Sequence, residues 1–268
     1  MSLDKTPKLM FVNSFAWIIV AFLLAPLFVV IPFSFTSERY LSMPNGQWSL
    51  RHYEAVFNDP AWLHAIGQST LIGLCAMIIA TVVGASAAIA SWQLKAMPGK
   101  IISILALMPL VVPSVVTAMA LSRSWVTLNL FDTFLGVILA HSIIGMPFVF
   151  LTVNAALSNL DERIVQAARS LGASSIKALI HVVVPNLKVS LFSGAAFAFF
   201  TSWDEVVVTL FVSSSNVYTL PRKIFTDIRE NIDPAVTAIA SMMILVTIVF
   251  AFYTLIKSRA KTSSEVVL

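Results

Sequence analysis

Six long apolar stretches alternate with shorter polar segments along the chain. A helix needs about 20 consecutive apolar residues to cross the hydrocarbon core of a membrane, and each stretch reaches that length. The pattern therefore predicts an all-α membrane protein with six transmembrane helices. We expect them at Phe11–Phe33, Ile66–Trp92, Ile101–Leu121, Leu135–Ala155, Val189–Val212 and Pro234–Ile256.

The composition supports a membrane protein and excludes a soluble domain. Hydrophobic residues make up 58% of the 268 residues and charged residues only 11%, whereas soluble domains carry about 25% charged residues. The first apolar run is longer than the roughly 7–15 residues of a signal-peptide core, so we expect it to be retained as a span. The single cysteine, Cys75, lies in an apolar run and is interpreted as a packing residue.

The positively charged residues indicate the orientation. Eleven of the seventeen Lys and Arg residues fall on one side of the predicted spans. Basic residues accumulate in cytoplasmic loops, so both termini are expected inside the cell, and the basic balance needs no nucleic-acid partner. The inner residues are Lys5, Lys8, Lys95, Lys100, Arg163, Arg169, Lys177, Lys188, Lys257, Arg259 and Lys261, and the outer ones are Arg39, Arg51, Arg123, Arg222, Lys223 and Arg229.

The chain is expected to have three regions. Residues 1–65 form a tail, the first transmembrane helix and an outer loop, Ser34–Ala65, whose aromatic residues suggest partial folding at the membrane surface. Residues 66–256 form a core of five transmembrane helices with a cytoplasmic loop at 159–185. Residues 257–268 form a cytoplasmic tail.

The polar segment Asn159–Pro185 predicts two short helices on the cytoplasmic side. Ser158 or Asn159 caps the first helix, Gly172 ends it in a left-handed conformation, Ser174 caps the second, and Pro185 stops it. Each helix carries one apolar stripe at helical spacing. The stripes are Ile164, Ala167, Ala168 and Leu171, and then Ile176, Leu179, Ile180 and Val183.

Three interpretations of this segment differ in what it touches. A DNA-binding helix-turn-helix is excluded because both ends run directly into membrane spans. An amphipathic loop lying on the lipid surface remains open. The interpretation that we favour is a docking element for a soluble partner.

Two adjacent acids, Asp204 and Glu205, fall inside the fifth predicted span. A charge at the bilayer centre costs about 2.5–3.5 kcal/mol on insertion scales, so the pair needs a function. A site for an organic cation, with Trp203 offering an aromatic face, is the leading interpretation. An ion pair with Arg123 or Arg222 and a proton relay are the alternatives.

Prolines and one histidine mark the neighbouring spans. Pro109 and Pro113 are expected to kink the third span and Pro147 the fourth, which either shapes a substrate path or serves packing. His141 in the fourth span either titrates or is a satisfied interface histidine, and we favour the second interpretation.

Sequence motifs of enzymes do not occur. The phosphate-binding pattern G-x-x-x-x-G-K-[ST] is absent, because Leu94 stands where the pattern ending at Gly99 and Lys100 needs glycine. H-E-x-x-H, G-x-S-x-G and C-x-x-C are absent as well. We therefore expect no enzyme active site, no metal and no cofactor in this chain.

The inner loop resembles a known motif. Gln166, Ala167, Ala168, Gly172, Ala173 and Pro185 match the spacing of the E-A-A-x-x-x-G-A…P loop of type I ABC importer permeases. The resemblance covers roughly Ile66–Ile256 and implies the permease fold of that family, with these six residues coupling the chain to a cytoplasmic ATPase. Gln166 stands where the family has Glu, so the size is kept and the charge is lost.

A second resemblance narrows the branch. Trp203–Phe211, Leu220-Pro221 and Asp233-Pro234-Ala235 are similar to spermidine/putrescine permeases of the C-subunit type. The resemblance implies that Trp203, Asp204 and Glu205 bind substrate, together with Ser114. Some polyamine permeases carry an acid at the position of Ser114, and its absence fits a substrate with less positive charge.

The sequence thus predicts a permease subunit of an ATP-driven importer in the bacterial inner membrane. Its substrate is expected to be a small organic cation, with a polyamine leading and a related amine or amino acid derivative next. The expected partners are a second permease subunit, an ATPase dimer, an external substrate-binding protein and membrane lipid. The alternatives are an ion-coupled secondary transporter that acts without an ATPase, and a non-transporting scaffold.

Overall fold

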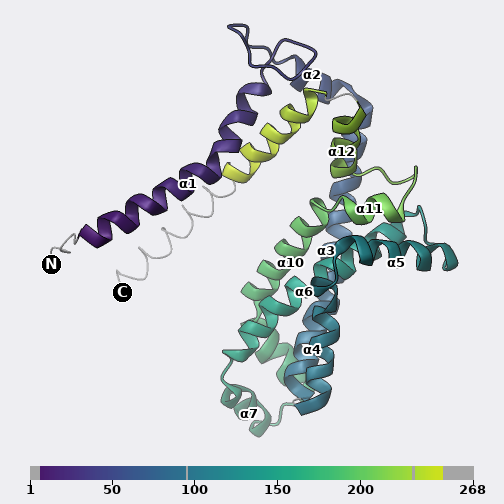
Figure 1. Ribbon diagram of the computed structural model, residues 1–268. Helices are drawn as coiled ribbons and strands as arrows, with labels where there is room; N and C mark the ends of the chain where they lie inside the picture. Colours follow the sequence, from purple (N-terminus) through teal and green to yellow (C-terminus); the bar gives the residue numbers. More distant parts are fainter. Residues whose placement is uncertain (1–6, 95, 231–232, 250–268) are drawn as a thin grey trace. The chain divides into compact units, whose positions relative to one another are not determined.

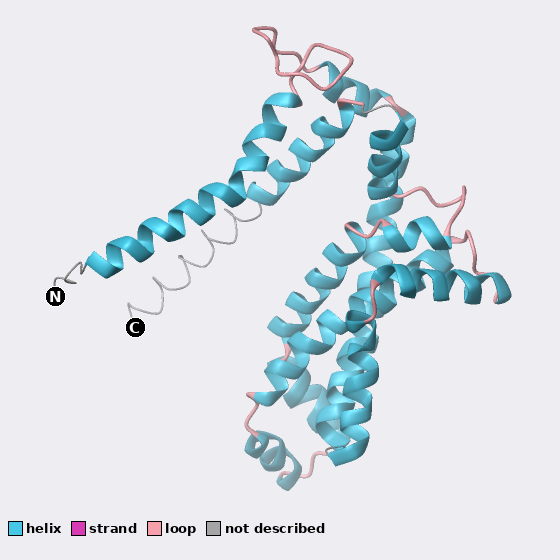
Figure 2. Cartoon of the chain, viewed as in Figure 1, coloured by secondary structure: helices cyan, strands magenta, loops and turns pink. Residues whose placement is uncertain are grey.

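The computed structural model describes residues 7–94, 96–230 and 233–249, with side chains from Val12 onward. These residues form helices and connecting loops, without strands (Figures 1 and 2). Lys95, the predicted tail at 257–268 and the end of the sixth predicted span lie outside the described residues.

The described helices follow one another with short connections. Their bounds are α1 Pro7–Phe33, α2 Arg51–Asn58, α3 Pro60–Leu94, α4 Ala96–Val111, α5 Ser114–Thr127, α6 Phe134–Ser158, α7 Glu162–Ser170, α8 Ser175–Ala178, the π-helical turn η1 Leu179–Val183, α9 Val184–Asn186, α10 Lys188–Trp203, α11 Val207–Val212 and α12 Leu220–Glu230, followed by an apolar helix at Ala235–Val249.

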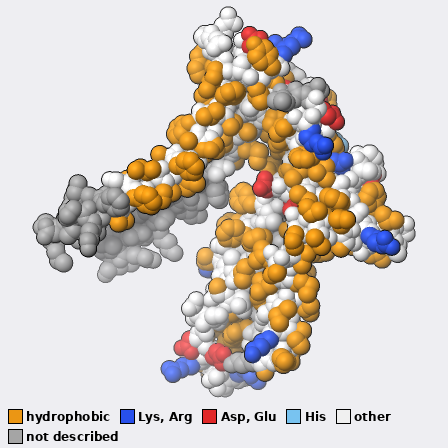
Figure 3. Space-filling view, in the orientation of Figure 1, with side chains coloured by type: hydrophobic (Ala, Val, Ile, Leu, Met, Phe, Trp, Pro, Cys, Tyr) orange, Lys and Arg blue, Asp and Glu red, His pale blue; other side chains and the backbone are white. Residues whose placement is uncertain are grey.

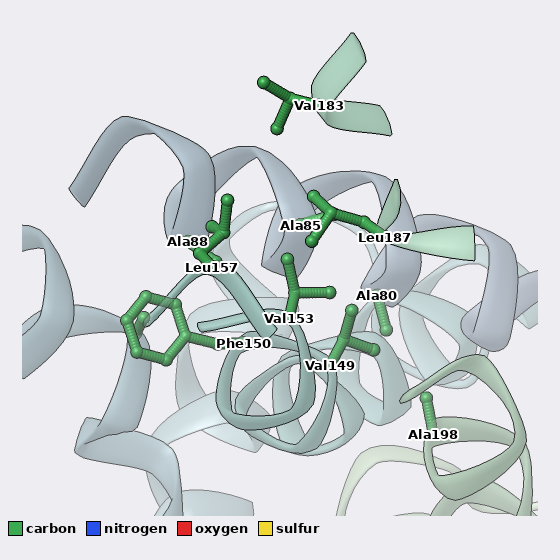
Figure 4. Packing of buried hydrophobic residues seen from close by; sticks show 11 residues of the cluster. Ala80, Ala85, Ala88, Val149, Phe150, Val153, Leu157, Val183, Leu187 and Ala198 are labelled. Atoms are coloured by element: carbon green, nitrogen blue, oxygen red, sulfur yellow. The ribbon is translucent and has the colours of Figure 1, made fainter. Parts of the chain in front are cut away.

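The chain divides into two compact units, and the larger one is His64–Phe225. Its main core lies where α6 packs against α3, α4 and α10, with contributions from the segment before α10 (Figure 4). Small and β-branched side chains fill this core, which lets helix backbones approach closely, as in other membrane proteins. The buried members are Ala80, Ala85, Ala88, Ala106, Val149, Phe150, Val153, Leu157, Val183, Leu187 and Ala198.

Two glycines set the closest approaches to α6. A Cβ on Gly84 of α3 would lie 2.8 Å from the carbonyl oxygen of Met146, and one on Gly194 of α10 would lie 2.5 Å from Oγ1 of Thr152. Both positions also face Val149. Glycine at these two positions is therefore what allows α3 and α10 to contact the same stretch of α6.

A second cluster joins α5, α6 and α11 in the same unit. Trp125 of α5 donates from Nε1 to the carbonyl oxygen of Gly136 at 2.7 Å, and Thr133 caps α6 by accepting from the amide of Gly136 at 3.0 Å. Val137 and Val208 are fully buried within this cluster. The start of α6 is thus fixed to α5 and α11.

The other unit consists of residues 1–63 and 226–268. The predicted outer loop is partly folded, as expected. Ser34 and Tyr53 share a hydrogen bond of 2.7 Å between their hydroxyls, the ring of Phe35 lies 5.3 Å from that of Tyr53, and His52 contacts the carbonyl oxygen of Glu38 at 2.9 Å. α2 forms within this segment.

Three helices are long and apolar enough to cross a membrane: Val12–Phe33, Pro60–Leu94 and Phe134–Ser158. They confirm the first, second and fourth predicted spans. Two further bent helix pairs would raise the number to five. The sixth prediction coincides with the shorter apolar helix at Ala235–Val249, which ends where the described residues end.

The third predicted span breaks at Pro113, where a kink was predicted, and the fifth was wrong as a continuous helix. α4 and α5 meet at an angle of 103°, because Pro113 has no N–H to continue the α4 ladder and begins α5 as its cap residue. α10 ends at Trp203, and α11 starts only at Val207. The segment before α10 bends by 69° against it.

Candidate functional site

The break between α10 and α11 holds the two predicted acids. Asp204 is the C-terminal cap residue of α10, and Glu205 follows in the turn. The carboxylate of Glu205 accepts a hydrogen bond from the amide of Val208 at 2.9 Å, so it satisfies an otherwise free N–H in the first turn of α11. The acids were expected on one continuous helix, and they lie instead in the turn that separates two helices.

The two acids differ in their surroundings. Glu205 is half-buried and engaged with α11, whereas Asp204 is exposed. Among the described residues, the Asp204 carboxylate has no hydrogen bond and no ion pair, and neither acid pairs with Arg123 or Arg222. The alternative of a structural ion pair with either arginine was therefore wrong, and Asp204 is the acid that is available to a ligand.

Aromatic residues directly precede Asp204 in the chain. The ring of Trp203 packs on that of Phe199, with 5.5 Å between centroids. Phe199 in turn contacts Phe200, with 5.7 Å between centroids. Aromatic faces attract organic cations, so the end of α10 carries two kinds of group that favour a cation.

Ser114 lies at a different cavity, of about 290 Å³, at the break between α4 and α5. The cavity is lined by the end of α4, the start of α5, Ile144 and Phe148 of α6, and Thr201 of α10. Its lining does not include the other three predicted substrate residues. The structure thus places Ser114 apart from Trp203, Asp204 and Glu205, although Thr201 precedes Trp203 by only two residues.

Polar groups in this cavity are unsatisfied within the described part of the chain. Helical threonines elsewhere donate to the carbonyl four residues earlier, as Thr70, Thr81 and Thr152 do at 2.7–3.0 Å. The hydroxyls of Thr117, Thr201 and Ser114 make no hydrogen bond to the described residues. Because Pro113 lacks an N–H, the carbonyl of Pro109 also loses its helical partner.

His141 of α6 is buried, with 1% of its surface exposed. Its Nδ1 lies 2.8 Å from Oγ of Ser202 in α10, and its Nε2 lies 2.9 Å from Oγ1 of Thr209 in α11. The expectation of a histidine with satisfied ring nitrogens is confirmed, and the structure adds that the side chain is buried.

The inner loop forms the two predicted helices with one different cap. Asp161, not Ser158 or Asn159, caps α7 by accepting from the amide of Arg163 at 2.9 Å, because α6 continues through Ser158 and uses Asn159 as its own C-terminal cap. Ser174 caps α8, as predicted, by accepting from the amide of Lys177 at 3.3 Å.

Gly172 ends α7 as predicted, with φ of +90°. The amide of Gly172 donates to the carbonyl of Arg169 at 3.0 Å, and the amide of Ala173 donates to the carbonyl of Ala168 at 3.1 Å. This pair of bonds is the Schellman motif. It sets a sharp turn between α7 and α8.

The first apolar stripe of this loop faces outward. Leu171 is 90% exposed, and Ile164 and Ala167 are exposed beside it. Val165, outside the predicted stripe, packs against the main core instead. In the second stripe Val183 is buried and Ile176 is 70% exposed. Apolar side chains therefore lie on the surface of this loop. Charged residues lie at the same end of the unit (Figure 3).

Gln166 faces back toward the same unit. It lines a cavity of about 340 Å³ together with Trp92 and Gln93 at the end of α3 and with Glu162, Val165, Arg169, Ser175, Ala178, Leu179 and Val183. The prediction that Pro185 stops the second helix was wrong. It lies inside α9, after the wider turn η1, and the backbone continues to Asn186.

Sequence reasoning missed a tightly bonded loop after α11. Asp132 accepts from the hydroxyls of Ser213 and Ser214, both at 2.8 Å, and from the amides of Ser214, Ser215 and Asn216 at 2.9–3.1 Å. Burial alone would raise the pKa of Asp132, but these donors outweigh it and hold the pKa well below its usual range. The run Ser213–Asn216 was the available signal, since such residues form turns that present amides.

Arg222 holds the other side of this loop. Its guanidinium donates to the carbonyl oxygens of Val217 at 2.9 Å and Ser214 at 2.6 Å, and it stacks over the ring of Tyr218 at 5.0 Å. Gln68 of α3 accepts from the amide of Tyr218 at 2.6 Å. The loop between α11 and α12 is therefore tied to three separate parts of the unit.

Comparison with known proteins adds a family. Residues 80–262 match the family described as "Binding-protein-dependent transport system inner membrane component". The chain is 30% identical over 237 residues to the spermidine/putrescine transport system permease protein PotC of Haemophilus influenzae, covering 88% of this chain and 91% of that protein. It is 30% identical over 230 residues to the putrescine transport system permease protein PotI of Escherichia coli, covering 83% and 82%.

A more distant relative and two solved structures complete the comparison. The putative 2-aminoethylphosphonate transport system permease protein PhnV of Salmonella typhimurium is 29% identical over 209 residues, covering 77% of this chain and 78% of that protein. A bacterial ABC transporter involved in alginate import matches with a TM-score of 0.72 at 14% identity, covering 95% of this chain and 98% of that chain. An amino acid ABC transporter matches with a TM-score of 0.56 at 17% identity, covering 76% and 94%.

Proposed function

Because this chain belongs to the family of inner membrane components of binding-protein-dependent transport systems, we propose that it forms part of the translocation path for a small organic cation, with a polyamine as the leading substrate class. The family makes the chain a multi-pass inner membrane permease of an ABC importer, in which a separate subunit hydrolyses ATP. That assignment replaces the alternative of a carrier that acts without an ATPase.

The observation that carries the substrate proposal is the free carboxylate of Asp204. It is exposed at a helix break, has no partner among the described residues, and belongs to the residue that follows Trp203 in the chain. The C-terminal end of α10 adds partial negative charge from its free carbonyl groups. Glu205 serves the site by holding the start of α11. A cationic ammonium group is the ligand that this arrangement attracts.

The cavity at Ser114 is proposed as a second binding site on the translocation path. The hydroxyls of Ser114, Thr117 and Thr201 and the carbonyl of Pro109 offer hydrogen-bond acceptors without adding a charge. An ammonium group can pass from one binding site to the next if neither site binds it too tightly. The neutral lining suits a substrate that carries fewer positive charges than spermidine.

The relatives support a substrate with an amine group. PotC and PotI are described as permeases of spermidine/putrescine and putrescine transport, and PhnV as one for 2-aminoethylphosphonate. An amine is common to all three compounds. Putrescine is therefore the first substrate to test and 2-aminoethylphosphonate the second.

The inner loop is proposed as the dock for the ATPase. Its exposed apolar stripe at Ile164, Ala167 and Leu171 offers a surface to a groove, and the Schellman turn at Gly172 fixes the angle between α7 and α8. Ala168 and Ala173 share one hydrogen bond of that turn, and Gln166 and Pro185 are proposed to take part in the same coupling. A second permease subunit, a dimer of ATPases and an external binding protein complete the proposed assembly, with both termini of this chain in the cytoplasm.

The test compares two variants that remove the same charge. The chain is assembled with its partner permease, ATPase and binding protein in proteoliposomes, and uptake of radiolabelled putrescine is measured per assembled complex. Loss of a charge-assisted contact is worth about 1.5–3 kcal/mol, so Asp204→Asn should slow uptake by at least about tenfold. Glu205→Gln should stay within about threefold of wild type, because the glutamine oxygen still accepts from Val208.

Three outcomes would overturn all or part of the proposal. Unchanged putrescine uptake by Asp204→Asn would remove Asp204 from the path. Equal losses in both variants would show that the acids act only through their summed charge and that the distinction between them is wrong. Uptake of 2-aminoethylphosphonate but not of putrescine by the wild type would reassign the substrate.

A further inference from the structure

One side chain bridges the two helices on either side of the acidic turn. His141 lies in α6, Ser202 is near the end of α10, and Thr209 is in α11. The imidazole contacts both hydroxyls, at 2.8 Å and 2.9 Å. Asp204 and Glu205 lie between the two contact points, so α6 holds both ends of the turn through a single residue.

The direction of each hydrogen bond follows from the third member of the network. The hydroxyl of Thr209 donates to the carbonyl oxygen of Glu205 at 3.2 Å. With that proton committed, we assign Thr209 as the acceptor from the histidine and place the ring proton on Nε2. Nδ1 then accepts from the hydroxyl of Ser202. All three side chains are buried, and each donor and acceptor in the chain of bonds is used.

The same network excludes a proton relay to the acids. Neither carboxylate is a member of it, because Glu205 takes part only through its backbone carbonyl and its carboxylate accepts from Val208. Both ring nitrogens of His141 are occupied by hydroxyls. What the network can do is fix the position of α11 relative to α10.

We propose that His141 is a positioning residue for the substrate-binding acid Asp204. This inference rests on the proposed function of Asp204. With the imidazole in place, α10 and α11 are tied to α6 at points two residues before Asp204 and five residues after it. Without it, the turn loses this direct tie to α6 and keeps its local hydrogen bonds, such as those from Val208 and Thr209 to Glu205, so that Asp204 can leave the orientation in which it faces the ligand.

The test is a double-mutant cycle with His141→Leu and Asp204→Asn in the reconstituted transporter. Leucine fills a similar volume but makes no hydrogen bond. Uptake of putrescine is measured at saturating loaded binding protein and normalised to assembled complex. His141→Leu should slow uptake about tenfold, but it should cause no further loss in the Asp204→Asn background, since residues that act as a unit are non-additive.

Conservative and control variants separate positioning from stability. His141→Gln retains one donor and one acceptor, so it should restore at least half of the uptake. Thr209→Val, which keeps the volume, should repeat the loss if His141→Leu fails to assemble. Ser142→Ala removes a hydroxyl bonded within α6 at 2.7 Å, beside His141 but away from the turn, and should leave uptake unchanged.

The results distinguish the positioning role of His141 from the proposed substrate-binding role of Asp204. Multiplying losses in the double variant, or wild-type uptake by His141→Leu, would overturn the positioning role while Asp204 stays in the path. An Asp204→Asn variant with normal uptake would overturn the proposed function and this inference together. A loss in Ser142→Ala equal to that in His141→Leu would identify a packing defect of α6 instead.

Discussion

Replacement of Gly172 perturbs the inner loop through backbone geometry alone. The residue has φ of +90°, and a Cβ built on it meets nothing within 4 Å. A side chain therefore adds no clash, and the whole cost is that of a left-handed conformation, about 1–2 kcal/mol for a residue other than glycine. A β-branched residue is the least tolerant of this conformation, so Gly172→Val is the stronger variant and Gly172→Ala the milder one.

This cost is enough to change the turn without unfolding the chain. A penalty of about 1.4 kcal/mol lowers the population of the Schellman turn relative to other arrangements by about tenfold. α7 and α8 would then no longer keep the angle that presents Leu171 and Ile176 together. If these side chains fill a groove of the ATPase, hydrolysis continues but drives fewer transport events.

The chain offers a matched control at Gly46. That residue has φ of +82° and also nothing within 4 Å of a built Cβ, but it lies in the loop between α1 and α2. Gly46→Val therefore carries the same backbone penalty at a place with no proposed role in coupling. A difference in coupling between Gly172→Val and Gly46→Val is therefore due to the position of the residue and not to backbone strain.

The assay measures ATP hydrolysis and putrescine uptake in the same proteoliposomes. Gly172→Val should lower the number of putrescine molecules taken up per ATP at least fivefold, a change of about 1 kcal/mol, whereas Gly46→Val should match the wild type. Equal ratios in the two variants, or wild-type coupling in Gly172→Val, would refute the docking role of this turn.

Two further predictions concern stability. Asp132→Ala removes the acceptor for six donors from the loop after α11. It should destabilise the protein by about 2–4 kcal/mol, at about 1.5–3 kcal/mol per charged hydrogen bond with partial compensation by water, and this is measured as a lower Tm in detergent. Folding lowers the pKa of Asp132 from 3.8. The stability that the Asp132 carboxylate contributes is therefore complete well above pH 3.8 and is lost as the pH falls toward the folded-state pKa. A Tm difference between wild type and Asp132→Ala that stays constant from about pH 7 to about pH 3 would contradict this reasoning. Gly84→Val places a side chain 2.8 Å from the carbonyl oxygen of Met146 and should cost about 1–3 kcal/mol by overpacking, whereas Gly67→Val, with nothing within 4 Å of its Cβ, should leave the Tm unchanged.

The parts of the fold that the sequence predicted well depend on local signals. Long apolar runs give α1, α3 and α6 directly, because helix length and hydropathy are read from consecutive residues. Gly172 and Ser174 were predicted with the right conformations because caps depend on one residue and its neighbours.

The parts that were wrong depend on tertiary contacts. Pro109 and Pro113 predicted a kink, and the chain does break at Pro113, but no local pattern reports that the bend reaches 103°. The apolar run through Val206–Val212 hid the end of α10, since hydropathy does not distinguish one helix from two. The spacing of Glu205 three residues before Val208 was the usable signal, because acids cap helices at that distance.

The sequence did not separate the structural roles of the candidate site residues. The two acids looked equivalent in the sequence, and only the contact from Glu205 to Val208 separates a structural carboxylate from a free one. Similarly, helical spacing grouped Ile164 with Leu171 as one stripe, but it could not show that the stripe is exposed while Val165 packs inward. His141 gave no signal of its bridging contacts, because its partners lie more than sixty residues away.

The central claim is that a cytoplasmic ATPase acts on this permease through the loop of α7 and α8, and site-directed thiol labelling tests it most directly. In a Cys75→Ser background, which removes the single cysteine, Leu171→Cys and Ser215→Cys each place one thiol at an exposed position. A membrane-impermeant maleimide should label Leu171→Cys only from the cytoplasmic side and much more slowly once the ATPase is bound, whereas Ser215→Cys should react only from outside. Labelling of Leu171→Cys from outside, or at a rate that the ATPase does not change, would contradict the account.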